Sequence, residues 1–230
     1  MNVWIAIGAV VVGYLFGAVS FTRIVGRWVL PGADLSGVDV PLGSGTIRFG
    51  RTSPTVISMK KGPGFGCLTG LADMAKAAVP VLVFKLVFPD QDYEFLVAAA
   101  AVIGHNYPVF YRLHGGVGIS PYLGGLAVLD WLAVPIVTVL GTLTGLALRN
   151  VVMAYAAGTV WLIPWFWWRD GGWPAIVYAV IINLAVWPIL WPIMRELTRM
   201  EEAGEIDRKE AMRMLLDGHP SLQRKKDQPE

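Results

Sequence analysis

The chain has 230 residues, of which 55% are hydrophobic and 16% are charged, and its mean hydropathy is +0.54. Its 19 basic and 17 acidic residues are unevenly spread, because 17 of these charges lie in residues 195–230. The rest of the chain is far less charged than soluble domains, where about one residue in four is charged, so we predict an integral membrane protein. The net charge of +2 and the single cysteine, Cys67, exclude a nucleic-acid binder and an intramolecular disulfide.

Long apolar stretches predict the membrane helices, since about 20 apolar residues span the hydrocarbon core. In chain order these stretches are residues 2–22, 66–88, 95–111, 119–148, 150–168 and 173–194. The first has no Lys or Arg before it and is long enough to span, so we predict a retained helix rather than a signal peptide. The fourth contains Asp130 and is long enough for one helix or two.

Positive charge favours two helices in the 119–148 stretch, because basic loops stay on the cytoplasmic side. A break near Asp130 places 16 of the 18 Lys and Arg residues of the loops and tail on one side, whereas an unbroken helix divides them 8 to 10. Lys85 and Arg169 then lie on the other side of the membrane. We predict an all-α, polytopic membrane bundle of about seven segments, with the N-terminus outside and the C-terminus inside. Residues 119–129 are too short to cross alone and are predicted to form a half-helix.

A basic, glycine-rich loop follows the first span. Residues 43–55 read GSGTIRFGRTSPT and residues 60–66 read KKGPGFG. Glycines let backbone N–H groups converge on a phosphate, and cations neutralise its charge. The same composition is equally typical of a flexible basic loop that follows the positive-inside rule.

Two charges, Asp73 and Lys76, lie within the second predicted span. A spacing of three places both on one face of a helix, where they can pair. Charges inside a membrane are costly and usually line a cavity or a polar path, which favours a functional role. A mutually satisfied structural pair, with Lys76 extending toward the interface, explains the pattern equally well.

The segment GHNYPVFYRLHGGVG, residues 104–118, is the most informative. His105 and Asn106 lie in the cytoplasmic half of a predicted helix, where their side chains need hydrogen-bonding partners. Pro108 can kink this helix, and the following glycines make a tight turn with an accessible backbone. A lone membrane histidine is more often a structural residue. A histidine, an asparagine and a glycine-rich turn on one basic face favour a functional site.

These segments resemble the bacterial acyl-phosphate-dependent glycerol-3-phosphate acyltransferases of the PlsY type, which are small multi-pass membrane enzymes. Residues 104–118 closely match the family segment GHNFPxFxxFxGGKG, and this match is fairly specific. The family segment xLTxxLDxxKG is similar to CLTGLADMAKA at residues 67–77, and YLxGSIPFxxxxGK is similar to YLFGAVSFTRIVGR at residues 14–27. The order and spacing agree over about residues 14–124.

The sequence departs from this pattern where the family places its charged and hydroxyl groups. Ungapped counting lays the family loop SGNPGATNVLR on residues 49–59, so its serine becomes Phe49 and its arginine becomes Met59. The lysine of GGKG becomes Val117, and the C-terminal family block has no clear counterpart in residues 186–197. A second register, with about five extra residues, starts the loop at Ser44 and leaves Arg48 or Arg51 in place of the arginine.

The resemblance implies transfer of an acyl chain from acyl phosphate to the 1-hydroxyl of glycerol 3-phosphate, which gives lysophosphatidic acid. It implies catalytic roles for His105 and Asn106 at the cytoplasmic face of the cell membrane, with no cofactor or metal. The residues expected to bind substrate phosphate are Ser44, Gly50, Arg51, Thr55, Lys60, Lys61, Gly115, Gly116 and Gly118.

Two other functions are considered beside this one. An inactive relative would bind lipid phosphates or a partner without turnover. Phe49, Met59 and Val117 suggest this function, because they replace the serine, arginine and lysine of the family pattern. A small-anion transporter would use Asp73 and Lys76, although no inverted repeat is evident. We divide the chain into a transmembrane domain, residues 1–194, and a charged cytoplasmic tail, residues 195–230, whose first part reads as a surface helix.

Overall fold

The computed structural model describes residues 2–42 and 45–205. The elements in this range are α1 (Val3–Ala18), α2 (Phe21–Val29), β1 (Val38–Leu42), β2 (Gly45–Phe49), α3 (Pro54–Lys61), α4 (Pro63–Val87), α5 (Tyr93–Asn106), the 3-10 helix η1 (Val109–Tyr111), α6 (Ile119–Leu129), α7 (Ala133–Ala147), α8 (Val151–Ala156), α9 (Gly158–Trp168) and α10 (Gly172–Glu202).

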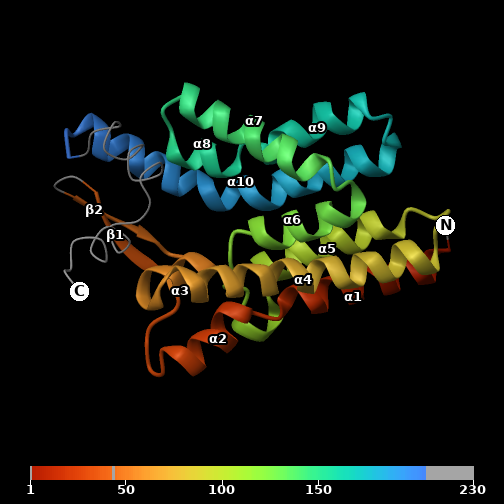
Figure 1. Ribbon diagram of the computed structural model, residues 1–230, viewed down its shortest axis with the longest axis horizontal. Coiled ribbons are helices and arrows are strands. Elements are labelled where there is room, and N and C mark those ends of the chain that lie inside the picture. Colours follow the sequence, from red (N-terminus) through yellow and green to blue (C-terminus); the bar gives the residue numbers. More distant parts are fainter. Residues whose placement is uncertain (1, 43–44, 206–230) are drawn as a thin grey trace, which may run out of the picture.

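The helices form two groups that lie along the long axis of the molecule (Figure 1). In one group α5 contacts α1, α4 and α6, and in the other α9 contacts α7 and α10. Contacts between α10 and α5 join the groups. The strands, α2 and α3 gather at one end, which we call the hairpin end, while the N-terminus lies at the opposite end (Figure 1).

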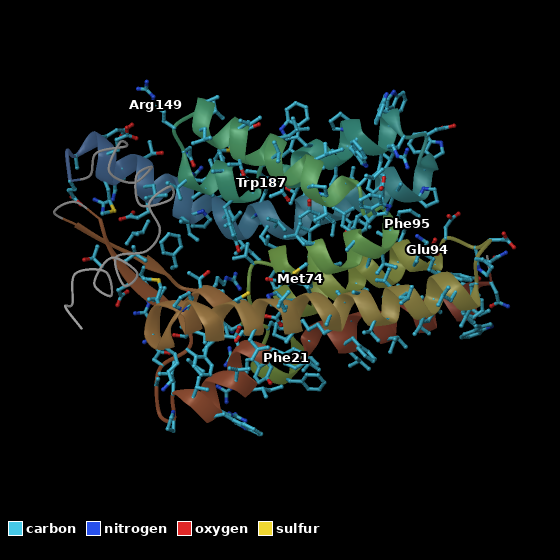
Figure 2. The ribbon with its side chains drawn as sticks, in the orientation of Figure 1. Phe21, Met74, Glu94, Phe95, Arg149 and Trp187 are labelled. Carbon is cyan, nitrogen blue, oxygen red and sulfur yellow. The ribbon has the colours of Figure 1, made fainter. Side chains whose placement is uncertain are left out.

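Glycines allow the helices of the first group to pack backbone against backbone. A Cβ on Gly17 of α1 would overlap the carbonyl group of Ala101 on α5. A Cβ on Gly124 of α6 would likewise overlap the carbonyl group of Met74 on α4, which is labelled near the centre of Figure 2. Small residues at such crossings permit the close approach on which helix packing in membranes depends.

Polar side chains hold α9 against α10 within the second group. The side-chain amide of Asn183 donates to the carbonyl oxygens of Thr159 and Ala179, each at 2.8 Å. The indole Nε1 of Trp187, labelled in Figure 2, donates to Oδ1 of Asn183 at 2.9 Å. Such pairs are favoured between membrane helices because an unpaired polar group in hydrocarbon is costly.

The predicted break near Asp130 is present, since α6 ends at Leu129 and α7 begins at Ala133. Asp130 accepts a hydrogen bond from the backbone N–H of Leu132 at 3.1 Å. Lys85 donates to the carbonyl oxygen of Val128 at 2.6 Å, at the end of α6. With 11 residues, α6 is about 16 Å long, so it is the short helix that the sequence predicted.

Three helical stretches among the described residues are long and apolar enough to cross a membrane: Val3–Val29, Pro63–Val87 and Gly172–Glu202. The helical membrane class is therefore confirmed, whereas the seven-segment count and the orientation stay predictions. The 150–168 stretch is divided into α8 and α9 rather than being one helix. The last helix passes the expected end at residue 194 and includes the first residues of the predicted tail; residues 206–230 lie outside the described range.

The first helix ends earlier than residue 22, which the apolar run suggested. It stops at Ala18, and Val19 is extended. The side chain of Ser20 then caps α2 by accepting from the backbone N–H of Arg23 at 3.4 Å. Hydrophobicity continues through this break, so composition alone did not reveal it, whereas a serine cap is a local signal for a new helix.

The all-α expectation is wrong at one place, because β1 (Val38–Leu42) and β2 (Gly45–Phe49) pair as antiparallel strands, with Val38 opposite Phe49. Apolar and polar residues alternate along β2, as in a strand with one covered face. Ile47 is buried against Met200 at the end of α10, while the neighbouring Arg48 is exposed. The hairpin is thereby fastened to the last helix.

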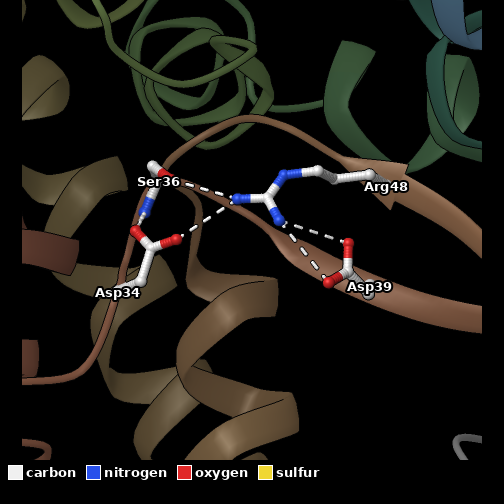
Figure 3. Close-up of polar contacts among 4 residues, drawn as sticks. All are labelled: Asp34, Ser36, Asp39 and Arg48. Atoms are coloured by element: carbon white, nitrogen blue, oxygen red, sulfur yellow. Dashed lines mark hydrogen bonds and ion pairs between the residues drawn. The ribbon is translucent and has the colours of Figure 1, made fainter.

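Figure 3 shows how Arg48 is held on the outer side of the hairpin. Its guanidinium group lies 3.2 Å from a carboxylate oxygen of Asp34 and 3.4 Å from one of Asp39. Asp34 also accepts from the backbone N–H of Ser36 at 2.8 Å. The hydrogen bonds from Ser36, with that of Arg48, lower the pKa of Asp34. The charge of Arg48 is therefore already balanced by two carboxylates.

Candidate functional site

The break between α1 and α2 opens the site by freeing the carbonyl oxygen of Val19. Lys76 of α4 donates its ammonium group to this oxygen. The same nitrogen lies 2.7 Å from Oδ1 of Asp73, and both side chains are buried. The pairing of Asp73 with Lys76 that the spacing predicted is thus present, on the side of α4 that faces α1 and α5.

Lys76 also reaches His105, the last residue but one of α5. The ammonium nitrogen lies 2.9 Å from Nδ1 of His105, and Oδ1 of Asp73 lies 3.9 Å from that ring nitrogen. A charged lysine only donates hydrogen bonds, so Nδ1 is the acceptor and the neutral imidazole carries its proton on Nε2. Asp73 and Lys76 thereby fix both the orientation and the tautomer of His105.

The glycine-rich turn packs directly on this histidine. The backbone N–H of Gly116 donates to the carbonyl oxygen of His105 at 3.1 Å. A Cβ on Gly115 would overlap that carbonyl oxygen, and a Cβ on Gly116 would overlap Nε2 of the ring. Gly118 has a φ of +90° and precedes α6. Glycine is needed at these positions because side chains would displace the imidazole or strain the backbone.

Asn106 connects the turn to the second group of helices. Its side chain is fully buried, and its amide nitrogen donates to the carbonyl oxygen of Ala185 on α10 at 2.8 Å. Its Oδ1 faces Gly118 and has no hydrogen-bond partner within the described residues. Buried polar atoms are usually paired, so this oxygen is an exception within the described residues.

The basic loop contributes Thr52 rather than the residues that the sequence singled out. The Thr52 side chain is buried, and its carbonyl oxygen lies 2.9 Å from the point where a Cβ on Gly116 would stand. Of the predicted phosphate-binding residues, Arg51 is half-buried beside Thr52, whereas those exposed to solvent are Gly50, Thr55, Lys60 and Lys61. Ser44 lies outside the described residues.

Arg23 of α2 is the residue at this site that the sequence analysis did not single out. Its Nη2 donates to the carbonyl oxygen of His114 at 2.9 Å and lies 3.2 Å from Oγ1 of Thr52. Its guanidinium carbon lies 4.5 Å from the centre of the Tyr111 ring. In the sequence Arg23 is simply the first cation after an apolar run, which marks the edge of a membrane span.

These contacts define a class of protein: a membrane-embedded helical bundle with a buried Asp–Lys–His chain behind a glycine-rich turn and a cation beside it. A family model described as glycerol-3-phosphate acyltransferase matches residues 7–200. The chain belongs to this family. The resemblance drawn from residues 14–27, 67–77 and 104–118 is thereby confirmed.

Individual relatives agree with this assignment. The chain is 39% identical to a glycerol-3-phosphate acyltransferase of Myxococcus xanthus over 121 residues, which are 52% of this chain and 58% of that protein. It is 30% identical to one of Pseudomonas aeruginosa over 177 residues, which are 77% of this chain and 88% of that protein. Its fold is similar to the crystal structure of PlsY in the glycerol 3-phosphate form, with a TM-score of 0.70, 24% identity and coverage of 91% of this chain and 98% of that one.

Proposed function

We propose that the protein transfers an acyl chain from acyl phosphate to the 1-hydroxyl of glycerol 3-phosphate, giving lysophosphatidic acid and inorganic phosphate. The observation that carries this proposal is the family match across residues 7–200, which includes every residue of the candidate site. The relatives named above are glycerol-3-phosphate acyltransferases, and the related PlsY structure is in a glycerol 3-phosphate form.

The chemistry requires positioning and charge stabilisation more than a strong base. The hydroxyl oxygen forms a bond to the acyl carbon, the bond from that carbon to the phosphate oxygen breaks, and the hydroxyl proton passes to the departing phosphate. Acyl phosphate is already activated, so the protein mainly aligns the two substrates and stabilises their negative charge. The backbone N–H groups of the glycine-rich turn and nearby cations suit these tasks.

His105 fits the role of a hydrogen-bond donor in this reaction. With Nδ1 accepting from Lys76, its Nε2–H is directed toward the turn, where it can donate to a phosphate oxygen or to the oxyanion of the transition state. Asp73 and Lys76 act as positioning residues because they hold the ring from behind. Asn106 supports the turn by linking it to α10 through its side-chain amide.

We further propose that the hairpin end faces the cytoplasm and that the protein lies in the cell membrane. Support comes from the basic residues, since those of α2, α3 and the loop after α7 lie at the hairpin end, whereas Lys85 and Arg169 lie at the other end. Basic residues next to membrane helices are retained on the cytoplasmic side.

Purified protein supplied with acyl phosphate and glycerol 3-phosphate should form lysophosphatidic acid, which mass spectrometry detects. Heat-denatured protein is the control for the spontaneous reaction. His105→Gln keeps a side-chain donor but loses the ring geometry, and it should lower kcat by about a hundredfold. Absence of product above the control would contradict the proposed activity.

A second candidate is an inactive relative that binds lipid phosphates, and the uncharged Phe49, Met59 and Val117 favour it. These three residues stand where the family pattern has a serine, an arginine and a lysine. This candidate predicts binding of lysophosphatidic acid to the detergent-solubilised protein without any turnover. Binding and turnover measured on one preparation separate the two candidates.

A further inference from the structure

We infer that Arg23 is the cation that binds substrate phosphate at the glycine-rich turn of this protein. The inference rests on the proposed function, because it assigns a ligand group to the same site. It differs from the sequence-based expectation, which placed the phosphate-binding cations in the loop at residues 48–61. The assignment follows from where the guanidinium group lies, which donors it retains and how the other cations are engaged.

Arg23 bridges two segments that meet at His105. Its Nη2 contacts the carbonyl oxygen of His114, the residue before Gly115, and the hydroxyl group of Thr52. The Thr52 carbonyl lies beside Gly116, and Gly116 lies against the His105 ring. The guanidinium group is therefore anchored at the rim of the turn whose backbone N–H groups and histidine would meet the substrate.

The geometry leaves Arg23 with donors to spare. A guanidinium group has five N–H donors in a planar fork, which matches two oxygens of a phosphate. The contacts to His114 and Thr52 use Nη2 alone. The Nε of Arg23 is buried and has no hydrogen-bond partner within the described residues, so the donors left for a ligand are those of Nη1. The Tyr111 ring, 4.5 Å from the guanidinium carbon, limits rotation of the fork through a cation–π contact.

Four other cations of this region, Arg48, Lys76, Lys60 and Lys61, are either paired or exposed to solvent. Arg48 is paired with Asp34 and Asp39, so its charge is balanced. The ammonium group of Lys76 is shared among Val19, Asp73 and His105. Lys60 and Lys61 are exposed on the last turn of α3. In the described part of the chain, Arg23 is the cation whose side chain hydrogen-bonds to both the turn and the loop.

The inference is tested by direct binding of glycerol 3-phosphate and of inorganic phosphate to the full detergent-solubilised chain, measured by calorimetry. Arg23→Gln removes the charge and the planar fork, and we expect its Kd for both ligands to rise by roughly ten- to a hundredfold. Arg23→Lys keeps the charge but loses the planar fork, so its Kd should lie between those of the unaltered protein and Arg23→Gln. Arg149→Gln is the matched control, because Arg149 is exposed and lies across the molecule from α2 (Figure 2).

A purely structural role for Arg23 predicts a different result. The Gln side chain is too short to reach the position of Nη2, so a structural role predicts a lowered thermal unfolding midpoint in Arg23→Gln and an unchanged salt dependence of the binding that remains. A phosphate-binding role predicts a weaker salt dependence of binding in Arg23→Gln and an unchanged thermal unfolding midpoint. Equal affinity in the two proteins, or the absence of phosphate binding by the unaltered protein, would overturn the inference.

Turnover measured on the same proteins separates the two proposals. Phosphate binding that depends on Arg23, without formation of lysophosphatidic acid, would contradict the proposed function and leave the role of Arg23 standing. Turnover with a KM for glycerol 3-phosphate that is unchanged in Arg23→Gln would support the proposed function and contradict the role of Arg23. Turnover with a KM raised by roughly tenfold or more in Arg23→Gln supports both.

Discussion

At the scale of single residues, the imidazole of His105 is enclosed on two sides. Lys76 holds Nδ1 from behind, and Gly116 lies against Nε2 in front. Nε2 therefore faces a residue without a side chain. This arrangement makes the position of the ring sensitive to one methyl group.

Gly116→Ala should lower kcat by about a hundredfold, because its Cβ would overlap Nε2 of His105 and move the ring away from the substrate. Displacements of about 1 Å in an active site have effects of this size. Initial rates of lysophosphatidic acid formation measure the change. Gly64→Ala, at a position with open space around it, is the control and should leave the rate unchanged. A Gly116→Ala protein with full activity would show that the turn does not constrain the ring.

Lys76→Met should destabilise the protein by about 3 to 5 kcal/mol, because it leaves the buried carboxylate of Asp73 without its counter-charge. The unfolding midpoint in detergent measures this loss. Replacing Asp73 as well, in Asp73→Leu/Lys76→Met, should recover much of the stability but no activity, since His105 then lacks its support. Glu196→Gln breaks an exposed pair of the same spacing, with Arg199, and should change the midpoint little.

At the scale of elements, the short helix α6 carries the turn and is fixed to α4. Gly118 is the N-cap residue of α6, and Gly124, in the middle of the helix, packs on the backbone of Met74. The Asp73–Lys76 pair lies on this same stretch of α4. Packing of α6 on α4 therefore sets the distance between the turn and the residues that hold His105.

Gly124→Ala should separate α6 from α4 and destabilise the protein by about 1 to 3 kcal/mol, because its Cβ would overlap the backbone of Met74. We expect kcat to fall as well, since the turn at the start of α6 shifts with the helix. Gly125→Ala is the neighbouring control, because the nearest atom to a Cβ there is the Cβ of Ala98 at 3.2 Å, and the nearest backbone atom is 3.8 Å away. Equal unfolding midpoints in the two variants would argue against close α4–α6 packing.

The hairpin links the first loop to the last helix. Ile47 and Met200 are buried against one another, with Phe49 packed beside them. The loop that carries Thr52 follows β2 directly, so its path toward Gly116 starts from a strand fastened to α10. Phe49, which stands at the family's serine in the ungapped register, thus has a packing role in this protein.

At the scale of the whole molecule, the Asp73–Lys76 pair lies in the middle of α4, beside Met74 near the centre of Figure 2, and α2 and the first loop reach the site from the hairpin end. The hairpin end carries most of the cations, and α4 and α10 each extend along the bundle from that end (Figure 1). Positive charge therefore gathers at the end of the molecule from which Arg23 reaches the glycine-rich turn. This arrangement suits substrates that carry phosphate groups in water and an acyl chain in lipid.

Cysteine labelling should place the hairpin end in the cytoplasm. Cys67 is the only cysteine of the chain, so Cys67→Ser gives a background for single reporters. Lys61→Cys, at the exposed end of α3, should react with an impermeant maleimide in inverted vesicles but not in intact cells. Gln91→Cys, between α4 and α5 at the opposite end, should behave in the opposite way. The reverse labelling pattern would contradict the proposed orientation and place the hairpin end outside the cytoplasm.

Much of this protein was predictable from local sequence. Charge counting located the break at Asp130, and a spacing of three predicted the pairing of Asp73 with Lys76. The hairpin escaped prediction because a strand pair of five residues each gives only a short alternating signal amid glycines. The end of α1 at Ala18 escaped it because the apolar run continues to Thr22.

The sequence by itself determined the membrane class, the family and the segments that carry His105, Asn106 and the glycine-rich turn, because composition and spacing are properties of the chain. Only the tertiary structure decided that Arg23 and Thr52 join that turn. Arg23 and His114 are 91 positions apart, and their contact depends on the break after α1 and on the folding of α5 back along α1. No local pattern encodes such a contact, because long-range packing alone brings the two segments together.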